Sequence, residues 1–332
     1  MPEPVQTTDM PIGNHVCIPA AVALCFAASA GAQNYPAKPI RVVVAFAPGG
    51  IADFAARSVT AKLSDAFGVS VVVDNRAGAG GITGADIVAK APPDGYTLLV
   101  TSISHTINPH VNRRMPFDAA RDFAPVTLLL DAPNILTVHP SLPVKSVREL
   151  IALARARPGQ ITYASSGNGT STHLSGELFK SLAKIDLLHV PYKGGGPAVV
   201  DLIGGHVQMM FSTLPTVLQQ VRAGRLRGLA VTGGKRFAAA NEFPTMIESG
   251  VAGYEVSGWS GLFAPAGTPR DAVQRIAAET VKILRTPELK ERFAAQGAEP
   301  AGNTPEEFTA FVLAELAKWK KVVDASGMRA DP

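Results

Sequence analysis

Two short stretches of glycine and hydroxyl residues stand where a strand is expected to pass directly into a helix. The first is Pro48-Gly49-Gly50, which follows the apolar run Ile40–Phe46 and precedes a helical stretch that begins at Ile51. A helix start carries four unpaired backbone N–H groups and the positive end of the helix dipole, so it favours a carboxylate or a phosphate. Asp53 in the first turn can cap these groups and pair with Arg57 at i+4. An ordinary glycine turn with a capping aspartate is the alternative interpretation.

The second stretch, Ser165–Thr170, presents hydroxyls, an amide and backbone N–H groups ahead of a helix expected over Thr172–Ala183. Two such junctions, one in each half of the chain, can hold both ends of an anion, or one carboxylate and a polar tail, without an ion pair. The loop Lys193–Gly196 can add one cation, and a solvent-exposed lysine is the alternative there.

Three aromatic residues lie close to these junctions or to the segments that join the two halves. Phe46 ends the first strand, Phe211 ends a later one, and Trp259 lies in an extended segment. Core packing is the ordinary role of each. Because the carboxyl ends of strands face the crevice in open α/β sheets, Phe46 and Phe211 are the better pocket candidates.

The usual signatures of catalysis, metal binding and nucleotide binding are missing. The sequence contains no G-x-S-x-G elbow, no H-E-x-x-H pair and no Walker A loop. The glycine-rich stretch Gly78–Gly81 begins like a dinucleotide loop but lacks the last glycine and follows the second strand. We therefore expect no cofactor and no metal. A secreted α/β hydrolase or isomerase with a non-standard site is the alternative, with Ser165 or Ser166 near His173 as its plausible pair.

The composition excludes several other classes of protein. The chain has 332 residues, 46% hydrophobic and 17% charged, which argues against disorder and is ample for a sizeable core. The formal net charge is +4, and no run of Lys or Arg exceeds two residues, so we expect no nucleic-acid partner. A weakly positive surface suits small anions instead.

The uncharged apolar run Val16–Ala30 is too short to span a membrane and has the length of the central part of a secretory signal. We predict a signal peptide over residues 1–32 and export from the cytoplasm. The segment before the run is atypical, because it carries Glu3 and Asp9 and neither Lys nor Arg. A cytoplasmic protein with an apolar N-terminus is the alternative. Both cysteines lie within this leader, and lipidation at Cys25 stays open.

After the leader, β-branched apolar runs alternate with helical stretches, which is typical of an open α/β sheet. The alternation occurs in two sets, joined by extended segments near Asp131–His139 and Tyr254–Ala264. Two such sets imply two lobes with a ligand cleft between them. Within the sets we expect strands at residues 40–46, 69–74, 96–101, 134–139, 161–164, 187–192, 207–211 and 226–232, and helices at residues 51–67, 82–91, 172–183, 269–284, 287–296 and about 304–325. Further helices are expected to begin after Ser146, at Pro197 and near Pro215.

A set of motifs also carries a family resemblance that runs from about Tyr35 to Gly327. The motifs are Pro48-Gly49-Gly50-x-x-Asp53-x-x-x-Arg57, Asp74-Asn75-Arg76-x-Gly78-Ala79-Gly80-Gly81, Pro93-Asp94-Gly95-Tyr96-Thr97-Leu98, His189-Val190-Pro191-Tyr192-Lys193-Gly194, Phe243-Pro244-Thr245-Met246-x-Glu248-x-Gly250 and Trp259-x-Gly261-Leu262-x-Ala264-Pro265-x-Gly267-Thr268-Pro269. Together they resemble the Bug family, the extracytoplasmic solute receptors of tripartite tricarboxylate transporters.

The resemblance implies an α/β, two-lobed type II periplasmic binding-protein fold, each lobe a mostly parallel sheet flanked by helices, with the ligand cleft between the lobes. We expect residues 35–130 with about 245–332 to form the first lobe and residues 131–244 to form the second. In the family, loops matching Ala47–Asp53 and Gly78–Gly81 hold a ligand carboxylate, partly through ordered waters. Many members carry Asp or Asn after the strand near residue 211, where this chain has Ser212. The missing acid argues against an amino-acid ligand.

These arguments predict a periplasmic solute receptor rather than an enzyme. The expected ligand is a small organic carboxylate, the expected partners are the membrane permease subunits of a tripartite transporter, and the expected state is a monomer. A ligand-binding sensor for a signalling partner is a further alternative. We predict the ligand-binding residues Phe46, Ala47, Gly49, Gly50, Asp53, Gly80, Gly81, Ser165, Ser166, Asn168, Thr170 and Ser212.

Overall fold

The computed structural model describes residues 1–6, 35–112 and 114–326. The chain divides into an N-terminal segment, Met1–Tyr35, and a folded unit, Pro36–Pro332. Most of the leader predicted over residues 1–32, both cysteines included, lies outside the described residues. Among the described helices, none combines the length and the apolar character that crossing a membrane requires.

The first sheet of the folded unit begins with three parallel strands in the order β2-β1-β3. These are β1 (Ile40–Val44), β2 (Val71–Asn75) and β3 (Thr97–Ser102). Four of the five residues of β1 are buried, as expected for a central strand covered on both faces. The sheet continues antiparallel through β9 (Ser257–Pro265) to the long β4 (Phe123–Val138), which also pairs with the short β10 (Glu299–Pro300).

The second sheet uses the other end of β4 and otherwise consists of strands from the middle of the chain. They are β5 (Thr162–Ser165), β6 (Leu188–Pro191), β7 (Met209–Thr213) and β8 (Arg227–Val231). Strands β6, β5 and β7 are parallel neighbours, whereas β7 and β8 pair antiparallel with β4. Among the described strands, parallel pairing occurs in one group of three strands in each sheet, and the sheets are more mixed than the sequence suggested. The reason is that β4 and β9 cross the unit as long antiparallel segments.

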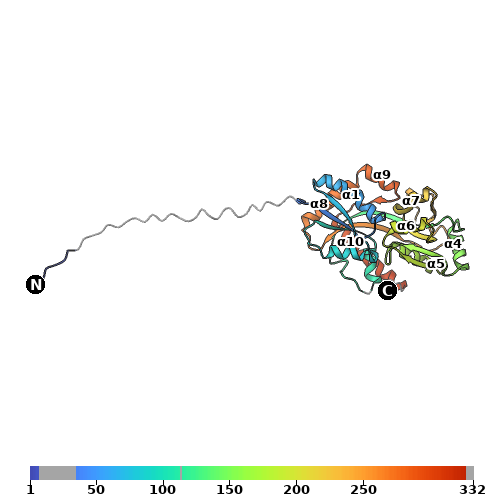
Figure 1. Cartoon of the computed structure of the whole chain (residues 1–332), viewed down its shortest axis with the longest axis horizontal. Helices are drawn as coiled ribbons and strands as arrows, with labels where there is room; N and C mark the ends of the chain where they lie inside the picture. Colours follow the sequence, from blue (N-terminus) through green and yellow to red (C-terminus); the bar gives the residue numbers. More distant parts are fainter. Residues whose placement is uncertain (7–34, 113, 327–332) are drawn as a thin grey trace. The chain divides into compact units, whose positions relative to one another are not determined.

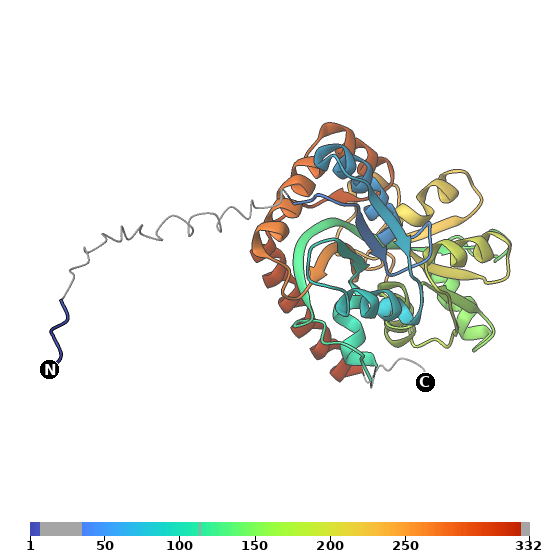
Figure 2. The same cartoon turned by 60° about the vertical axis from the view of Figure 1, so that its left-hand side comes forward.

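Helices from distant parts of the sequence surround the first sheet (Figure 1). They are α1 (Ile51–Phe67), α2 (Ile82–Ala89), α3 (Ser104–Val111), α8 (Arg270–Leu284), α9 (Pro287–Ala295) and α10 (Pro305–Ser326). The long red helix in Figure 2 is α10, which packs against β4 and α3. The C-terminal part of the chain thus returns to the sheet that the N-terminal strands begin.

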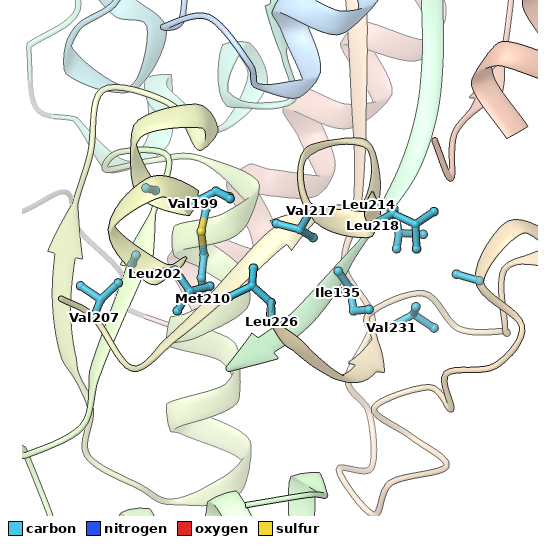
Figure 3. Close-up of a cluster of buried hydrophobic side chains, with 13 residues drawn as sticks. Ile135, Val199, Leu202, Val207, Met210, Leu214, Val217, Leu218, Leu226 and Val231 are labelled. Carbon is cyan, nitrogen blue, oxygen red and sulfur yellow. The ribbon is translucent and has the colours of Figure 1, made fainter. Parts of the chain in front are cut away.

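The second sheet carries α4 (Val147–Ala156), α5 (Ser171–Ala183), α6 (Gly195–Ile203) and α7 (Leu214–Arg222). Buried aliphatic side chains of α6 and α7 meet those of β4, β7 and β8 in one cluster, shown in Figure 3. Burial of one such side chain contributes about 1.5–3 kcal/mol. The cluster fixes the beginnings of α6 and α7 relative to the sheet. Its labelled members are Ile135, Val199, Leu202, Val207, Met210, Leu214, Val217, Leu218, Leu226 and Val231.

Most predicted elements are confirmed to within a few residues, and helix α1 has the predicted bounds. Two differences matter for the site. Strand β4 begins at Phe123, eleven residues before the expected Asn134, because it pairs with β9 along its first half. Helix α3 was not predicted, since its eight residues include Pro109 and give little helical periodicity.

Candidate anion-binding site

A small cavity lies where the two sheets face each other. Its volume is about 20 Å³, which is the space of one water rather than of an organic acid. None of the described residues that line it has an ionisable side chain. The lining consists of Phe46, Gly50, Ile51, Ala52, Ser102, Ser166, Thr170, Ser171, Thr172, Gly195, Thr213 and Thr216.

Four helices begin at this cavity. The N-cap of α1 is Gly50, that of α5 is Thr170, and that of α7 is Thr213, while Gly195 is the first residue of α6. Each helix start carries the equivalent of about half a positive charge and unpaired backbone N–H groups. Four converging starts therefore create a positive field without a cationic side chain, and the arrangement suits an anion.

The junction between β1 and α1 is held by a buried carboxylate that is not part of the cavity lining. Asp53 Oδ2 accepts hydrogen bonds from Gly49 N at 3.0 Å and from Arg57 Nε at 3.1 Å. Its other oxygen accepts from Arg57 Nε and from Asn75 Nδ2, each at 3.0 Å. Asn75 Nδ2 also donates to Phe46 O at 2.9 Å. The i+4 pairing expected of Asp53 is confirmed, whereas the expected capping is not, because Asp53 accepts from Gly49 N ahead of the helix and α1 has no side-chain cap. Its role is to shape the loop.

The junction between β5 and α5 is held by hydroxyl groups that bond to one another. Thr170 Oγ1 donates to Gly167 O at 2.7 Å and accepts from His173 N at 3.3 Å, which caps α5. Thr172 Oγ1 lies 2.9 Å from Thr170 Oγ1 and accepts from Ser166 N at 2.8 Å. The cavity therefore faces hydroxyls whose geometry is already fixed.

Ser165 is fully buried beneath this junction and outside the cavity lining. Its Oγ lies 2.7 Å from His189 Nε2 and accepts from Gly167 N at 3.1 Å. The hydroxyl of Ser165 is therefore paired with His189, whereas His173, which the hydrolase alternative placed near Ser165 or Ser166, accepts from Gly169 N through Nδ1 at 3.2 Å. The two imidazole rings stack with centroids 4.3 Å apart. A serine held in this way has no access to a substrate in the cavity.

The loops of the two sheets also touch each other beside the cavity. Ala47 N donates to Lys193 O at 3.1 Å, while the Lys193 side chain is exposed and not part of the lining. Asn108 Nδ2, from α3, donates to Gly80 O at 3.0 Å. On the same side, Gly81 lies against the ring of Phe46, the one predicted aromatic that lines the cavity.

Other predicted residues lie elsewhere. Ser212 is fully buried in β7 opposite Ile135, and its hydroxyl has no hydrogen-bond partner among the described residues. Phe211 stacks on Tyr254 in the core, with ring centroids 6.0 Å apart. Trp259 is buried as well and donates from Nε1 to Glu315 at 3.1 Å. Among the predicted set, Phe46, Gly50, Ser166 and Thr170 line the cavity, whereas Ala47, Gly49, Asp53, Gly80, Gly81, Ser165, Asn168 and Ser212 do not.

Five hydroxyl residues of the lining were not predicted from the sequence: Ser102, Ser171, Thr172, Thr213 and Thr216. Strand β7 continues to Thr213, two residues past the predicted end at Phe211, so the side-chain alternation turns Thr213 rather than Ser212 to the cavity. Thr213 Oγ1 lies 2.8 Å from Thr216 Oγ1. The signal was present in Pro215, because proline in a first turn marks a helix that begins directly after the strand.

The ionisable side chains near the cavity, such as Glu177, lie outside its lining. Burial raises the pKa of Glu177, but hydrogen bonds from Tyr163 and Lys180 outweigh burial and hold it below its usual range. Tyr163 Oη donates to Glu177 Oε1 at 2.5 Å, and the Tyr163 ring stacks on His189. Within the described part of the chain, no cluster of His, Cys, Asp and Glu has the arrangement of a metal site.

Comparison with known families agrees with this geometry. Residues 55–328 match the profile of the family described as "Tripartite tricarboxylate transporter family receptor". The chain belongs to this family. This confirms the Bug-type solute receptor expected from the sequence motifs, and the family and its structural neighbours are solute-binding receptors.

Three solved structures show how closely the receptor follows the fold. The periplasmic binding protein BugD is 33% identical with a TM-score of 0.86, over 89% of the receptor and 99% of BugD. MatC from Rhodopseudomonas palustris with bound malate is 31% identical with a TM-score of 0.83, over 87% of the receptor and 100% of MatC. Rpa4515 of R. palustris with adipate is 39% identical with a TM-score of 0.86, over 89% and 99% of the two chains. The two-lobed binding-protein fold is thereby confirmed.

Proposed function

We propose that the receptor binds a small organic carboxylate in the periplasm by closing two lobes over the cavity. The observation that carries the proposal is the convergence of four helix starts on a lining without ionisable side chains. Such a site compensates a carboxylate by backbone N–H groups and dipoles rather than by an ion pair. The adipate and malate in the two related structures support the same ligand class.

The lining also supports a choice among carboxylates. An ammonium group would find no carboxylate partner among the residues of the cavity wall, which disfavours amino acids. The hydroxyls of Ser166, Thr172, Thr213 and Thr216 can hydrogen-bond a second polar end of the ligand. Dicarboxylic and hydroxy acids therefore fit the site best.

The lobes must separate to admit an organic acid and then close around it with a wider cavity than the space of about 20 Å³ found here. We assign residues 35–130 with about 245–332 to one lobe and residues 131–244 to the other, joined by β4 and β9. The closed form would present a surface made by both lobes to the permease subunits of a tripartite transporter. The receptor would act as a monomer after removal of residues 1–32. The second candidate function is that of a sensor, in which the closed form binds a signalling partner instead of the permease.

A thermal-shift screen tests the proposal. The purified receptor, refolded to remove any bound acid, is heated with adipate, malate, other di- and tricarboxylates and aromatic acids, with amino acids and sugars as controls. A ligand at about 100 times its Kd adds about 2.7 kcal/mol of stability, which raises the Tm by several degrees. A rise with one class of acid, recovered unchanged after incubation, supports a receptor. No rise with any acid would contradict the carboxylate, and consumption of the acid would favour an enzyme.

A further inference from the structure

We propose that Gly196 is a positioning residue for binding, since its missing side chain allows the two lobes to close although it does not line the cavity. The inference rests on the proposed function, because closure is taken to be the step that traps the acid. Closure then depends on one backbone contact between the lobes, which we call the glycine seam. We define this seam as Ala47–Gly50 against Lys193–Gly196.

The two halves of the seam come from different sheets. Ala47–Gly50 follows β1 of the first sheet, and Lys193–Gly196 follows β6 of the second. The hydrogen bond from Ala47 N to Lys193 O, at 3.1 Å, joins the two segments directly. A β-carbon built on Gly196 would overlap the carbonyl oxygen of Pro48, so only glycine allows this approach.

Neither half of the seam can yield easily to an added methyl group. The obstacle at Pro48 is a backbone oxygen rather than the end of a flexible side chain. The loop around it is fixed by the buried Asp53, whose carboxylate holds Gly49 N at 3.0 Å. On the other side, Gly196 lies in the first turn of α6, which the buried cluster of Figure 3 fixes to the second sheet. The remaining way to accommodate the methyl group is to keep the lobes apart.

A second contact of the same kind lies nearby. A β-carbon on Gly80 would overlap the carbonyl oxygen of Asn168, which again places backbone of the first sheet against backbone of the second. Gly80 has a φ of +62°, so alanine there would be strained whatever the neighbours. Gly196 has no positive φ, so alanine meets less backbone strain there than at Gly80, although Pro197 disfavours a helical alanine before it.

The test compares Gly196→Ala with Gly204→Ala, which makes the same change at the exposed end of α6. There, the β-carbon would meet mainly the side chain of His206, which can move away. Titration calorimetry with adipate and malate should show about tenfold weaker binding for Gly196→Ala, as a tenfold fall in the closed population requires. The Tm without acid should fall only slightly, because Pro197 disfavours a helical alanine before it. Gly204→Ala should match the wild type in both.

Small-angle X-ray scattering without added acid gives a second measurement that does not depend on the ligand. Gly196→Ala should have a larger radius of gyration than the wild type and Gly204→Ala. Scattering and affinity identical to the wild type would overturn the inference, and so would an equal loss of affinity in Gly204→Ala. A wild type that binds neither acid nor any other in the screen contradicts the proposed function instead. In that case the scattering comparison by itself tests the role of Gly196, and superimposable curves for Gly196→Ala and the wild type would overturn it.

Discussion

The two junctions that face each other across the cavity are built on different chemistry. At β1–α1 the chain uses glycine backbone, and the charged groups that hold it lie behind: Asp53 bonds to Gly49 N, Arg57 and Asn75. At β5–α5 the chain uses hydroxyls, and Thr170 caps its own helix. Helix α1 has no side-chain cap at Gly50.

The difference separates two functions of a helix start. A helix capped by its own side chain satisfies part of its N–H groups internally, whereas an uncapped helix leaves them for a ligand. We therefore expect the ligand carboxylate to bind at the α1 start, and the hydroxyls of the α5 start to bind the remainder. Three substitutions each change one junction and leave the other intact, and a change of pH tests the first sheet away from both junctions.

The largest effect is expected from Asp53→Ala, which removes the group that holds the first junction. Gly49 N, Arg57 and Asn75 all lose a partner next to a buried position, so the free energy of unfolding should fall by about 3 kcal/mol. Affinity should fall as well, although the carboxylate does not line the cavity. Urea unfolding and calorimetry measure both, and the exposed Asp65→Ala on the same helix is the matched control. Unchanged stability and affinity would remove Asp53 from this role.

A fall in pH should lower the free energy of unfolding through His105 of α3, which packs on the first sheet. Burial lowers the pKa of His105 to about 4, although its ring is 2.9 Å from Ala119 O. Between pH 6.5 and 4 the unfolded chain therefore takes up a proton that the folded chain does not, and stability falls as the pH falls. From pH 6.5 to 5 the loss is about 2 kcal/mol, at about 1.4 kcal/mol per unit. His105→Gln should lose this part of the pH dependence, and equal slopes in both proteins would contradict the assignment.

The two junctions also differ in how far the sequence could predict them. The β1–α1 junction was predictable, because Gly49, Gly50, Asp53 and Arg57 interact within one turn of a helix that periodicity defines well. Local spacing is enough to place such groups. Asn75 takes part from the next strand, and no local spacing reveals it.

The residues of the second sheet that line the cavity could not be predicted in this way, because they are placed by contacts between segments far apart in the sequence. Thr216 lines the cavity only because α6 and α7 pack on β7, and Ser165 pairs with His189 because β5 and β6 are neighbours. Phe211 was expected at the pocket, yet it lies in the core since the strand runs on to Thr213. An error of two residues at the strand end thus kept the correct face of the sheet but placed the prediction one position too early along it.

A medium effect is expected from Thr170→Val, which removes the cap of the second junction. His173 N, Gly167 O and Thr172 each lose a hydrogen-bond partner, so stability should fall by about 1.5 kcal/mol. Ser146→Ala is the control, because it removes the cap of α4 away from the cavity. Both variants should be less stable by denaturant unfolding, and only Thr170→Val should bind the acid more weakly. Equal affinities would show that the hydroxyl serves the helix alone.

The smallest effect is expected from Asn168→Asp, which adds charge to the second junction at nearly constant shape. The helix dipole favours a carboxylate two residues before the cap of α5, but Asn168 Oδ1 is buried without a hydrogen-bond partner, so the lost hydration should lower stability slightly. The same carboxylate competes with the ligand for the positive field, and affinity should fall about threefold at low ionic strength and less at high salt. Asn241→Asp, outside the cavity lining, is the control. If Asn168→Asp binds as tightly as the wild type at low salt, the α5 start contributes no field to the ligand. The uncapped α1 start would then be the one carboxylate site of the two.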